Sequence, residues 1–113
     1  LKKLQRNNIS SFLPVLKKLG KENLGYLSFP ISGWTLSIDL PAKNKKIEHL
    51  LQEIDKEIAE IGGRIYLAKD SRQSALIFKK TYQLYNSWQQ QKYKLDPKNI
   101  FSSDISSRLN LCN

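Results

Sequence analysis

The chain has 113 residues, of which 40% are hydrophobic and 26% are charged, and its formal net charge is +9. This length predicts one domain with the composition of an ordinary folded protein, and no apolar run reaches the roughly 20 residues of a membrane-spanning helix. A single cysteine, Cys112, excludes an internal disulfide, so we expect an inert thiol in a reducing compartment. The chain begins at Leu1 and contains no methionine, which predicts a piece of a longer protein.

The positive charge is concentrated toward the two ends of the chain. Residues 1–20 carry five basic and no acidic side chains, residues 21–60 carry five and seven, and residues 61–113 carry nine and three. Such an excess can recruit nucleic acid, an acidic membrane surface or a phosphorylated substrate. A solvated face, or a surface that meets an acidic partner domain, is the more ordinary interpretation.

Two strands are predicted in the first third of the chain. The segment SSFLPVLKKLG contains Pro14, which argues against a helix interior and favours an edge strand. The segment GWTLSIDLP, bracketed by Pro30 and Pro41, alternates large apolar side chains with small polar ones. Its apolar face would carry Trp34, Leu36, Ile38 and Leu40.

An amphipathic helix is predicted over residues 47–61, with Asn44 as a plausible N-cap and Gly62-Gly63 as a strong stop. Its apolar stripe should cover a sheet that contains the strand after Pro30, because each fully buried aliphatic side chain is worth about 1.5–3 kcal/mol. We interpret the carboxylates from Glu48 to Glu60 as a solvated face. His49 has no second ligand nearby, so we predict no metal site.

The second half of the chain is predicted to be mostly helical. A strand over residues 64–68 should follow the first helix at once and complete a strand–helix–strand unit. Asp70 or Ser71 could then cap a helix that runs to about Leu84. Side chains available for packing on this helix are Ala75, Phe78, Tyr82 and Tyr85. Trp88 and Tyr93 continue the aromatic series, which at this spacing more often forms core than a nucleic-acid stacking surface.

A turn is predicted at Asp96-Pro97, and SSDISSRLNL predicts a short terminal helix capped by Ser102 or Ser103. The elements together predict an α+β fold in which an antiparallel sheet has helices packed on one face. Neither a Ser/His/acid set nor a cluster of metal ligands can be assembled around the one histidine and the one terminal cysteine, which disfavours an acyl-transfer enzyme or a metal hydrolase. Gly62-Gly63 also lacks the spaced third glycine of a dinucleotide fingerprint.

Three blocks of the chain together resemble a known family: LSFPISGWTLSIDLP, EIGGRIYLAKDSR and LDPKNIFSSDISSRLNL. They are similar, in the same order and with similar gaps, to the C-terminal part of the flavin-dependent decaprenylphosphoryl-ribose 2′-oxidases and their FAD-linked relatives in the vanillyl-alcohol oxidase superfamily. The resemblance runs from about Phe12 to Leu111. The sugar-lactone oxidases are more distant relatives and supply a neighbouring alternative.

The resemblance implies a C-terminal fragment of a two-domain flavoprotein. Residues 1–63 would end the substrate-binding (cap) domain, and residues 64–113 would return to the FAD-binding domain. Because the N-terminal FAD-binding segment would be missing, we expect the fragment alone to be inactive and its bared surfaces to favour self-association. The resemblance also implies a bacterial protein in the cytoplasm or peripheral to the inner membrane, a sugar or polyprenyl-phosphate sugar as substrate, and no nucleic-acid partner.

The resemblance further implies the residues of the site. The catalytic residues would be Lys69 and Asp39; the cofactor-binding residues Tyr66, Ala68 and Lys69; and the substrate-binding residues Lys17, Ser37 and Asp39. The lysine matching Lys69 faces the pyrimidine edge of the flavin, where hydride transfer leaves negative charge that an ammonium stabilises. Lys17 suits a phosphate-bearing substrate, and Asp39 would orient the pocket lysines or accept a proton from the sugar hydroxyl.

Two departures from the family pattern concern the pocket. Ser37 stands where some members carry a cysteine, and Leu19 replaces a bulkier aromatic residue. These changes alter the expected pocket shape and the sensitivity to thiol-directed inhibitors. The alternative from another functional class is a non-catalytic basic module for nucleic acid or acidic membranes, whose binding should weaken steeply with salt.

Overall fold

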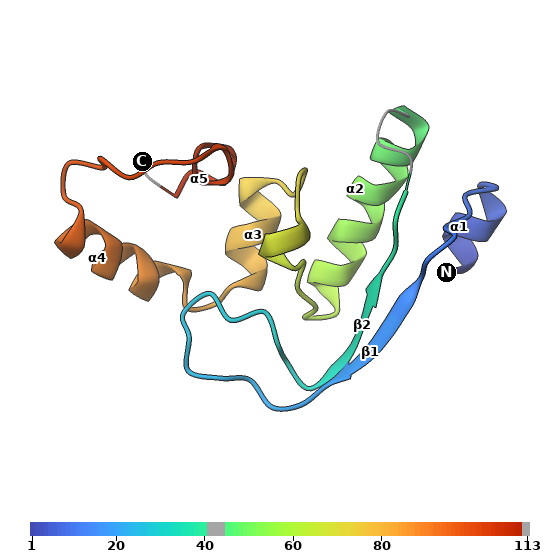
Figure 1. Ribbon diagram of the computed structural model, residues 1–113, viewed down its shortest axis with the longest axis horizontal. Coiled ribbons are helices and arrows are strands. Elements are labelled where there is room, and N and C mark those ends of the chain that lie inside the picture. Colours follow the sequence, from blue (N-terminus) through green and yellow to red (C-terminus); the bar gives the residue numbers. More distant parts are fainter. Residues whose placement is uncertain (41–44, 112–113) are drawn as a thin grey trace.

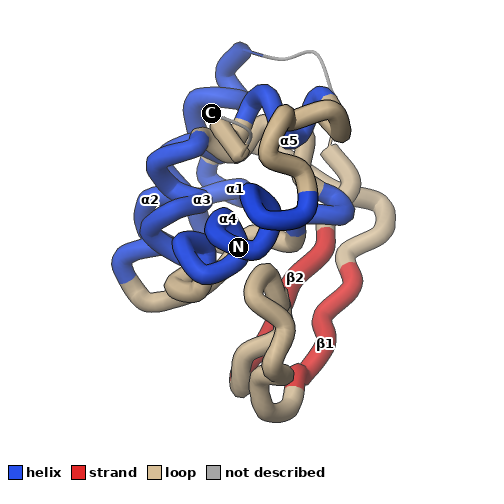
Figure 2. Tube along the Cα trace, turned by 90° about the vertical axis from the view of Figure 1, so that its left-hand side faces the viewer, coloured by secondary structure: helices blue, strands red, loops and turns tan. Residues whose placement is uncertain are grey.

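The chain folds into a two-stranded ribbon with a group of helices beside it (Figures 1 and 2). The structure, a computed structural model, describes residues 1–40 and 45–111. In chain order its elements are α1 (Lys2–Arg6), β1 (Val15–Leu19), β2 (Gly33–Ser37), α2 (Lys45–Glu60), the 3₁₀ turn η1 (Leu67–Lys69), α3 (Ala75–Thr81), α4 (Tyr85–Leu95) and α5 (Asp104–Arg108). This architecture confirms the predicted α+β class with an antiparallel sheet.

Both strands predicted in the first third of the chain form. β1 confirms the edge strand predicted around Pro14, and β2 confirms the strand predicted after Pro30, whereas Pro41 lies outside the described residues. The two strands pair antiparallel with Lys17 opposite Thr35. Directly opposite residues share a face of the ribbon, so this register decides which side chains lie together.

The apolar face predicted for β2 is exposed. Trp34 and Leu36 are 68% and 39% exposed, and Leu16, opposite Leu36 on β1, is 62% exposed. Thr35 and Ser37, on the other face, are half-buried. The prediction that the large apolar side chains of this strand are buried against the amphipathic helix is therefore wrong, because the packing of the ribbon leaves its small polar side chains on the more buried face.

α2 confirms the predicted amphipathic helix, and its end shows why two glycines follow it. Gly62 has a φ of +78°, in the left-handed region that favours glycine, and its N–H donates to the Ala59 carbonyl at 3.4 Å. The Gly63 N–H donates to the Ile58 carbonyl at 2.7 Å, and a Cβ on Gly63 would lie 2.7 Å from Ile58 Cγ2. The predicted N-cap, Asn44, lies outside the described residues.

Residues 64–68 do not form the strand that was predicted to follow α2, so the prediction of a strand–helix–strand unit is wrong. Among the described residues this segment has no ladder partner, and it ends in the 3₁₀ turn η1. Hydrogen bonds of the Arg64 side chain hold it instead. Nη1 donates to the Ser28 carbonyl at 2.8 Å, and Nε donates to the Thr81 carbonyl at 3.0 Å. Arg64 thereby joins the loop between the strands to α3.

The helix predicted to run to Leu84 is divided into α3 and α4. Its N-cap is Ser74, whose Oγ accepts the N–H of Ile77 at 3.3 Å, and not Asp70 or Ser71. Asp70 accepts backbone N–H groups in the turn before α3 instead. Short polar side chains such as those of Asp70, Ser71 and Ser74 compete for nearby backbone N–H groups. The N-cap is the one whose oxygen accepts an N–H of the first helical turn.

The hydrophobic core lies among α3, α4 and the C-terminal segment. Phe78 and Tyr82 are 0% and 1% exposed, and the Phe78 ring centroid lies 5.1 Å from that of Tyr82 and 5.3 Å from that of Tyr85. Leu109 and Leu111 complete this cluster. The predicted packing role of these three aromatic residues is confirmed, and Trp88 packs against them, whereas Tyr93 is exposed and does not belong to the core. The prediction that a sheet packs against the apolar stripe of α2 is wrong. α2 packs on α3, and much of its apolar stripe lines a cavity.

Two features predicted near the C-terminus form. A turn follows Asp96, whose carboxylate accepts hydrogen bonds from Lys92 Nζ at 2.5 Å and the Ile100 N–H at 2.8 Å. The hydrogen bond from Lys92 holds the pKa of the Asp96 carboxyl below its ordinary value. Ser103 caps α5 in a reciprocal capping box with Ser106, which confirms one of the two predicted caps.

Replacing Tyr82 should change how stability depends on alkaline pH. Burial raises the pKa of the Tyr82 hydroxyl to about 12, and this hydroxyl donates to the Ile65 carbonyl at 2.7 Å. A raised pKa in the folded state gives stability that is complete below the unfolded value near 10 and is lost as the pH rises toward 12. The stability difference between wild type and Tyr82→Phe should therefore shrink from pH 9 to pH 12 in urea denaturation of the 113-residue chain. Exposed Tyr93 is the control: a Tyr93→Phe difference that shrank equally would contradict the assignment.

Candidate functional site

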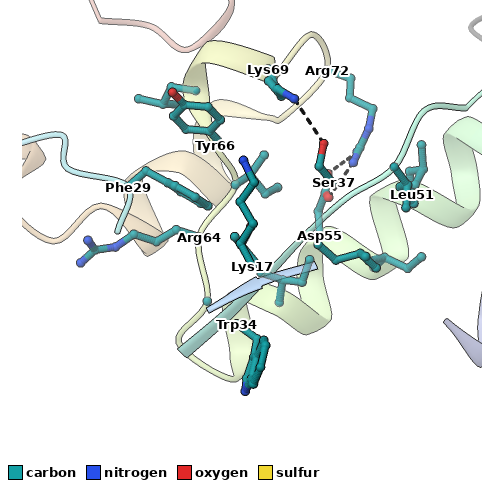
Figure 3. A pocket seen from close by; sticks show the side chains of 18 of the residues that line it. Lys17, Phe29, Trp34, Ser37, Leu51, Asp55, Arg64, Tyr66, Lys69 and Arg72 are labelled. Carbon is teal, nitrogen blue, oxygen red and sulfur yellow. Dashed lines mark hydrogen bonds and ion pairs between the residues drawn. The ribbon is translucent and has the colours of Figure 1, made fainter. Parts of the chain in front are cut away.

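A cavity of about 1420 Å³ lies between the ribbon, α2 and the segment that follows Gly62 (Figure 3). α2 supplies an apolar wall with Leu51, Ile54 and Ile58. The ribbon and the segment after α2 supply polar side chains, and the figure shows Trp34 pointing away from them. Clefts with apolar walls and a few convergent polar groups are typical of small-molecule sites.

Lys69 is the last residue of η1, and its side chain lines this cavity. Its Nζ donates to Ser37 Oγ on β2 at 3.4 Å, a long hydrogen bond that joins segments 32 positions apart. Lys69 forms no salt bridge within the described residues, so its charge stays available to a ligand. The structure therefore brings two of the predicted site residues together.

Lys17 and Asp39 line the same cavity from the ribbon side. Lys17 lies opposite Thr35 on the face that also carries Ser37, and Figure 3 shows it reaching toward the space beside Tyr66. Asp39 lies just beyond β2, where its backbone N–H donates to Ser11 Oγ at 3.1 Å. Among the described residues, the Asp39 carboxylate forms no salt bridge with Lys17 or Lys69. The structure therefore does not show Asp39 orienting these two lysines.

Tyr66 and Ala68 belong to the turn that carries Lys69. Tyr66 is 45% exposed and packs against Phe29, with ring centroids 4.8 Å apart and ring planes tilted by 38°. Ala68 is exposed in the middle of η1. Phe29 was not among the predicted site residues, because only the fold brings the loop between the strands to this turn.

A buried ion pair at the cavity wall was missed by the sequence analysis. Arg72 donates to both carboxylate oxygens of Asp55 on α2, with Nη2 and Oδ1 2.8 Å apart. Asp55 is 4% exposed, so the interpretation of every α2 carboxylate as solvated is wrong at this position. Its place among the apolar positions of the helix, one residue after Ile54, was the available signal. A buried carboxylate needs such a partner, because an unpaired charge there is strongly destabilising.

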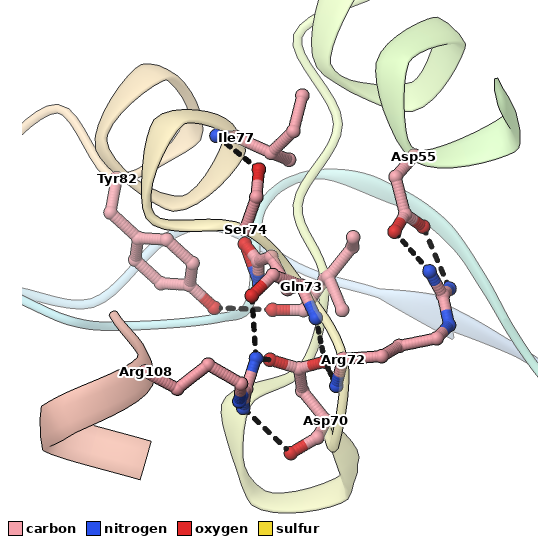
Figure 4. Close-up of polar contacts among 9 residues, drawn as sticks. Asp55, Asp70, Arg72, Gln73, Ser74, Ile77, Tyr82 and Arg108 are labelled. Atoms are coloured by element: carbon pink, nitrogen blue, oxygen red, sulfur yellow. Dashed lines mark hydrogen bonds and ion pairs between the residues drawn. The ribbon is translucent and has the colours of Figure 1, made fainter. Parts of the chain in front are cut away.

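A second network is centred on Asp70, the residue that follows Lys69 in the chain (Figure 4). Asp70 Oδ2 accepts a hydrogen bond from Arg108 Nη1 of α5 at 3.0 Å, and Oδ1 accepts the Gln73 N–H at 2.9 Å. The Asp70 side chain is 2% exposed. Gln73 is fully buried, and neither polar atom of its amide finds a partner among the described residues. Nothing in the local sequence pattern indicated the partnership of Asp70 and Arg108.

The residues present fit one edge of a planar ring with electronegative atoms. Lys69 keeps unused donor capacity at the cavity wall, and the adjacent Tyr66 ring is partly exposed. Ser28, which also lines the cavity, has a buried hydroxyl without a partner in the described part of the chain. These residues could contact a flavin ring and its substrate, whereas the sequence supplies no glycine-rich loop for a pyrophosphate.

Other classes of site are weakly represented in the described residues. His49 is exposed and lies 3.7 Å from Glu53 one helical turn away. No three His, Cys, Asp or Glu side chains gather there in a way that could hold a metal ion, and Cys112 lies outside these residues. None of the helices described combines the length and apolar character needed to cross a bilayer.

Comparison with known proteins places the chain beside an oxidase, of which it matches the C-terminal part. That relative is decaprenylphosphoryl-beta-D-ribose oxidase of Mycolicibacterium smegmatis, which is 40% identical over 108 residues, or 96% of this chain and 23% of the relative. An "uncharacterized protein in mprA 5′region" of Streptomyces coelicolor is 40% identical over 97 residues, covering 86% of this chain and 26% of the relative. No protein-family model matches. The predicted resemblance is confirmed, and the chain spans about a quarter of the length of these curated relatives.

Proposed function

We propose that the chain is the substrate- and flavin-contacting part of an FAD-dependent oxidoreductase that oxidises a secondary hydroxyl of a polyprenyl-phosphate pentose or a similar sugar. The observation that carries the proposal is the hydrogen bond between Lys69 and Ser37 at the wall of a cavity that Lys17 also lines. The M. smegmatis relative, a decaprenylphosphoryl-beta-D-ribose oxidase, supports the substrate class.

The proposal includes an organisation into two parts. Residues 1–63 would end a substrate-binding domain, and residues 64–113 would return to a domain that binds FAD mainly through other parts of the polypeptide. The exposed ribbon face with Leu16, Trp34 and Leu36 supports further protein contacts, since large exposed apolar patches mark interaction surfaces. The chain alone would then be inactive. We place the full protein in the bacterial cytoplasm or at the periphery of the inner membrane.

The side chains of this chain would bind and orient the substrate. FAD, when bound, would accept the hydride from the carbinol carbon. Lys69 would present its ammonium where negative charge develops, and such preorganised charge is often the largest electrostatic contribution to catalysis. Lys17 would attract the phosphate of the substrate as a point charge, and Asp39 would accept the proton of the reacting hydroxyl. The apolar wall of α2 would exclude water from the cavity.

The test is a flavin titration on the full-length protein. Purified protein should show a flavin absorption spectrum, and anaerobic addition of a polyprenyl-phosphate pentose should bleach it. Bleaching by an aldonolactone precursor instead would favour a sugar-lactone oxidase. A full-length protein that binds no flavin would refute the proposal, and salt-sensitive binding to nucleic acid or anionic vesicles would then favour the basic-module alternative.

A further inference from the structure

We propose that Asp70 and Arg108 are positioning residues, which hold Lys69 at the cavity wall from behind. The inference deepens the proposed function and rests on it for the role of Lys69. Neither residue lines the cavity. Their action would be exerted through the backbone on which Lys69 sits.

The turn that carries Lys69 is too short to hold the side chain in place alone. η1 has three residues, and its backbone hydrogen bonds run from the Lys69 N–H to the Tyr66 carbonyl at 3.0 Å and from the Asp70 N–H to the Leu67 carbonyl at 3.3 Å. Short 3₁₀ turns have poorer hydrogen-bond geometry than α-helices. The contact of Lys69 with Ser37 is itself 3.4 Å long. Further contacts are therefore needed to fix the ammonium.

Asp70 and Arg108, neither of which lines the cavity, supply these contacts in the network that Figure 4 shows. The Arg108 guanidinium donates hydrogen bonds to the Asp70 carboxylate, to the Asp70 carbonyl at 3.2 Å and to the Gln73 carbonyl at 2.6 Å. The carboxylate also accepts the N–H groups of Arg72 and Gln73 at 3.0 and 2.9 Å. Hydrogen bonds to charged groups are about twice as strong as neutral ones, so the backbone next to Lys69 is held on both its donor and its acceptor groups.

Two other elements, α2 and β2, also form hydrogen bonds with the segment from Lys69 to Arg72. The Arg72–Asp55 pair joins it to α2, and the Lys69–Ser37 contact joins it to β2. Arg108 adds the third attachment, to α5, which lies 38 positions along the chain from Asp70. The orientation of Lys69 is thus set by parts of the chain that a change in α5 can disturb without touching the cavity.

The first test reads the position of Lys69 without reference to flavin or turnover. The full-length protein is briefly acetylated with an N-hydroxysuccinimide ester, and the modification of each lysine is quantified by peptide mass spectrometry. Arg108→Gln should change the labelling of Lys69 severalfold, because the ammonium moves relative to Ser37, and should leave Lys80 of α3 unchanged. Arg6→Gln, an exposed arginine on α1, should change neither. Unchanged Lys69 labelling in Arg108→Gln would overturn the inference.

The second test separates positioning from a general loss of stability. Arg108→Gln should slow flavin reduction by substrate roughly 10–100-fold, because a displacement of a functional group by about 1 Å can cost about 10²-fold in rate. In a Lys69→Ala background the same change should have no further effect, whereas equal slowing in both backgrounds would overturn the inference. If the wild type shows no flavin reduction, the proposed function fails. The labelling result alone then decides whether Asp70 and Arg108 position Lys69.

A second variant keeps both tests decisive if Arg108→Gln does not fold. Asp70→Asn retains an oxygen that can accept the N–H groups of Arg72 and Gln73, but it removes the charge that Arg108 binds. It should change Lys69 labelling in the same direction as Arg108→Gln, and it should also slow flavin reduction. Wild-type values in both measurements for folded Asp70→Asn would contradict the inference.

Discussion

Lys69→Ala should slow flavin reduction by substrate about 10²–10³-fold in the full-length protein, which is the usual cost of removing one preorganised group that stabilises transition-state charge. Lys69 lines the cavity, and its ammonium has one long hydrogen bond, to Ser37. At an effective dielectric constant of about 20, a unit charge 4 Å away contributes roughly 4 kcal/mol before desolvation is subtracted. Anaerobic stopped-flow absorbance of the flavin band measures the rate.

Two further variants define what the Lys69 result means. Lys80→Ala removes an exposed lysine from α3 and should leave the rate within about twofold of wild type. Lys69→Arg keeps the charge but changes the shape of the donor group, so it should recover only part of the rate. Normal bleaching in Lys69→Ala would remove Lys69 from the mechanism, whatever the ancestry of the chain.

Phe78→Ala should destabilise the 113-residue chain by about 3–5 kcal/mol, the usual cost of truncating a buried aromatic side chain. Phe78 is 0% exposed, and its ring contacts those of Tyr82 and Tyr85 in the core that joins α3 to α4. The surrounding side chains can collapse only partly into the space that the ring leaves. Urea denaturation followed by circular dichroism measures the change in the free energy of unfolding.

The control for Phe78 lies on the same helix. Leu76 is 78% exposed on α3, so Leu76→Ala should change the free energy of unfolding by no more than about 0.5 kcal/mol. Both substitutions leave the helix with a good helix former, so the comparison isolates burial. A loss below about 1 kcal/mol for Phe78→Ala would show that the aromatic cluster is not the core of the chain.

The sequence by itself determined those features whose signals are local. The apolar spacing of α2, the left-handed glycine that ends it and the capping box at Ser103 depend on residues within a few positions of one another. The strands near Pro14 and Pro30 and the aromatic packing of Phe78 could be predicted for the same reason. The three blocks that carry the family resemblance also predicted Lys69 and Ser37 as site residues, and the structure places both at the wall of one cavity.

Only the tertiary structure decided how distant segments meet. The packing of the ribbon left Thr35 and Ser37 half-buried and Trp34 exposed. Residues 64–68 do not form a strand, because a strand needs a backbone partner and only β1 and β2 pair in the described part of the chain. The Asp70–Arg108 pair joins positions 38 apart, and no local pattern specifies such a contact. Sequence spacing determines which face of an element is apolar, whereas pairing and packing determine what that face meets.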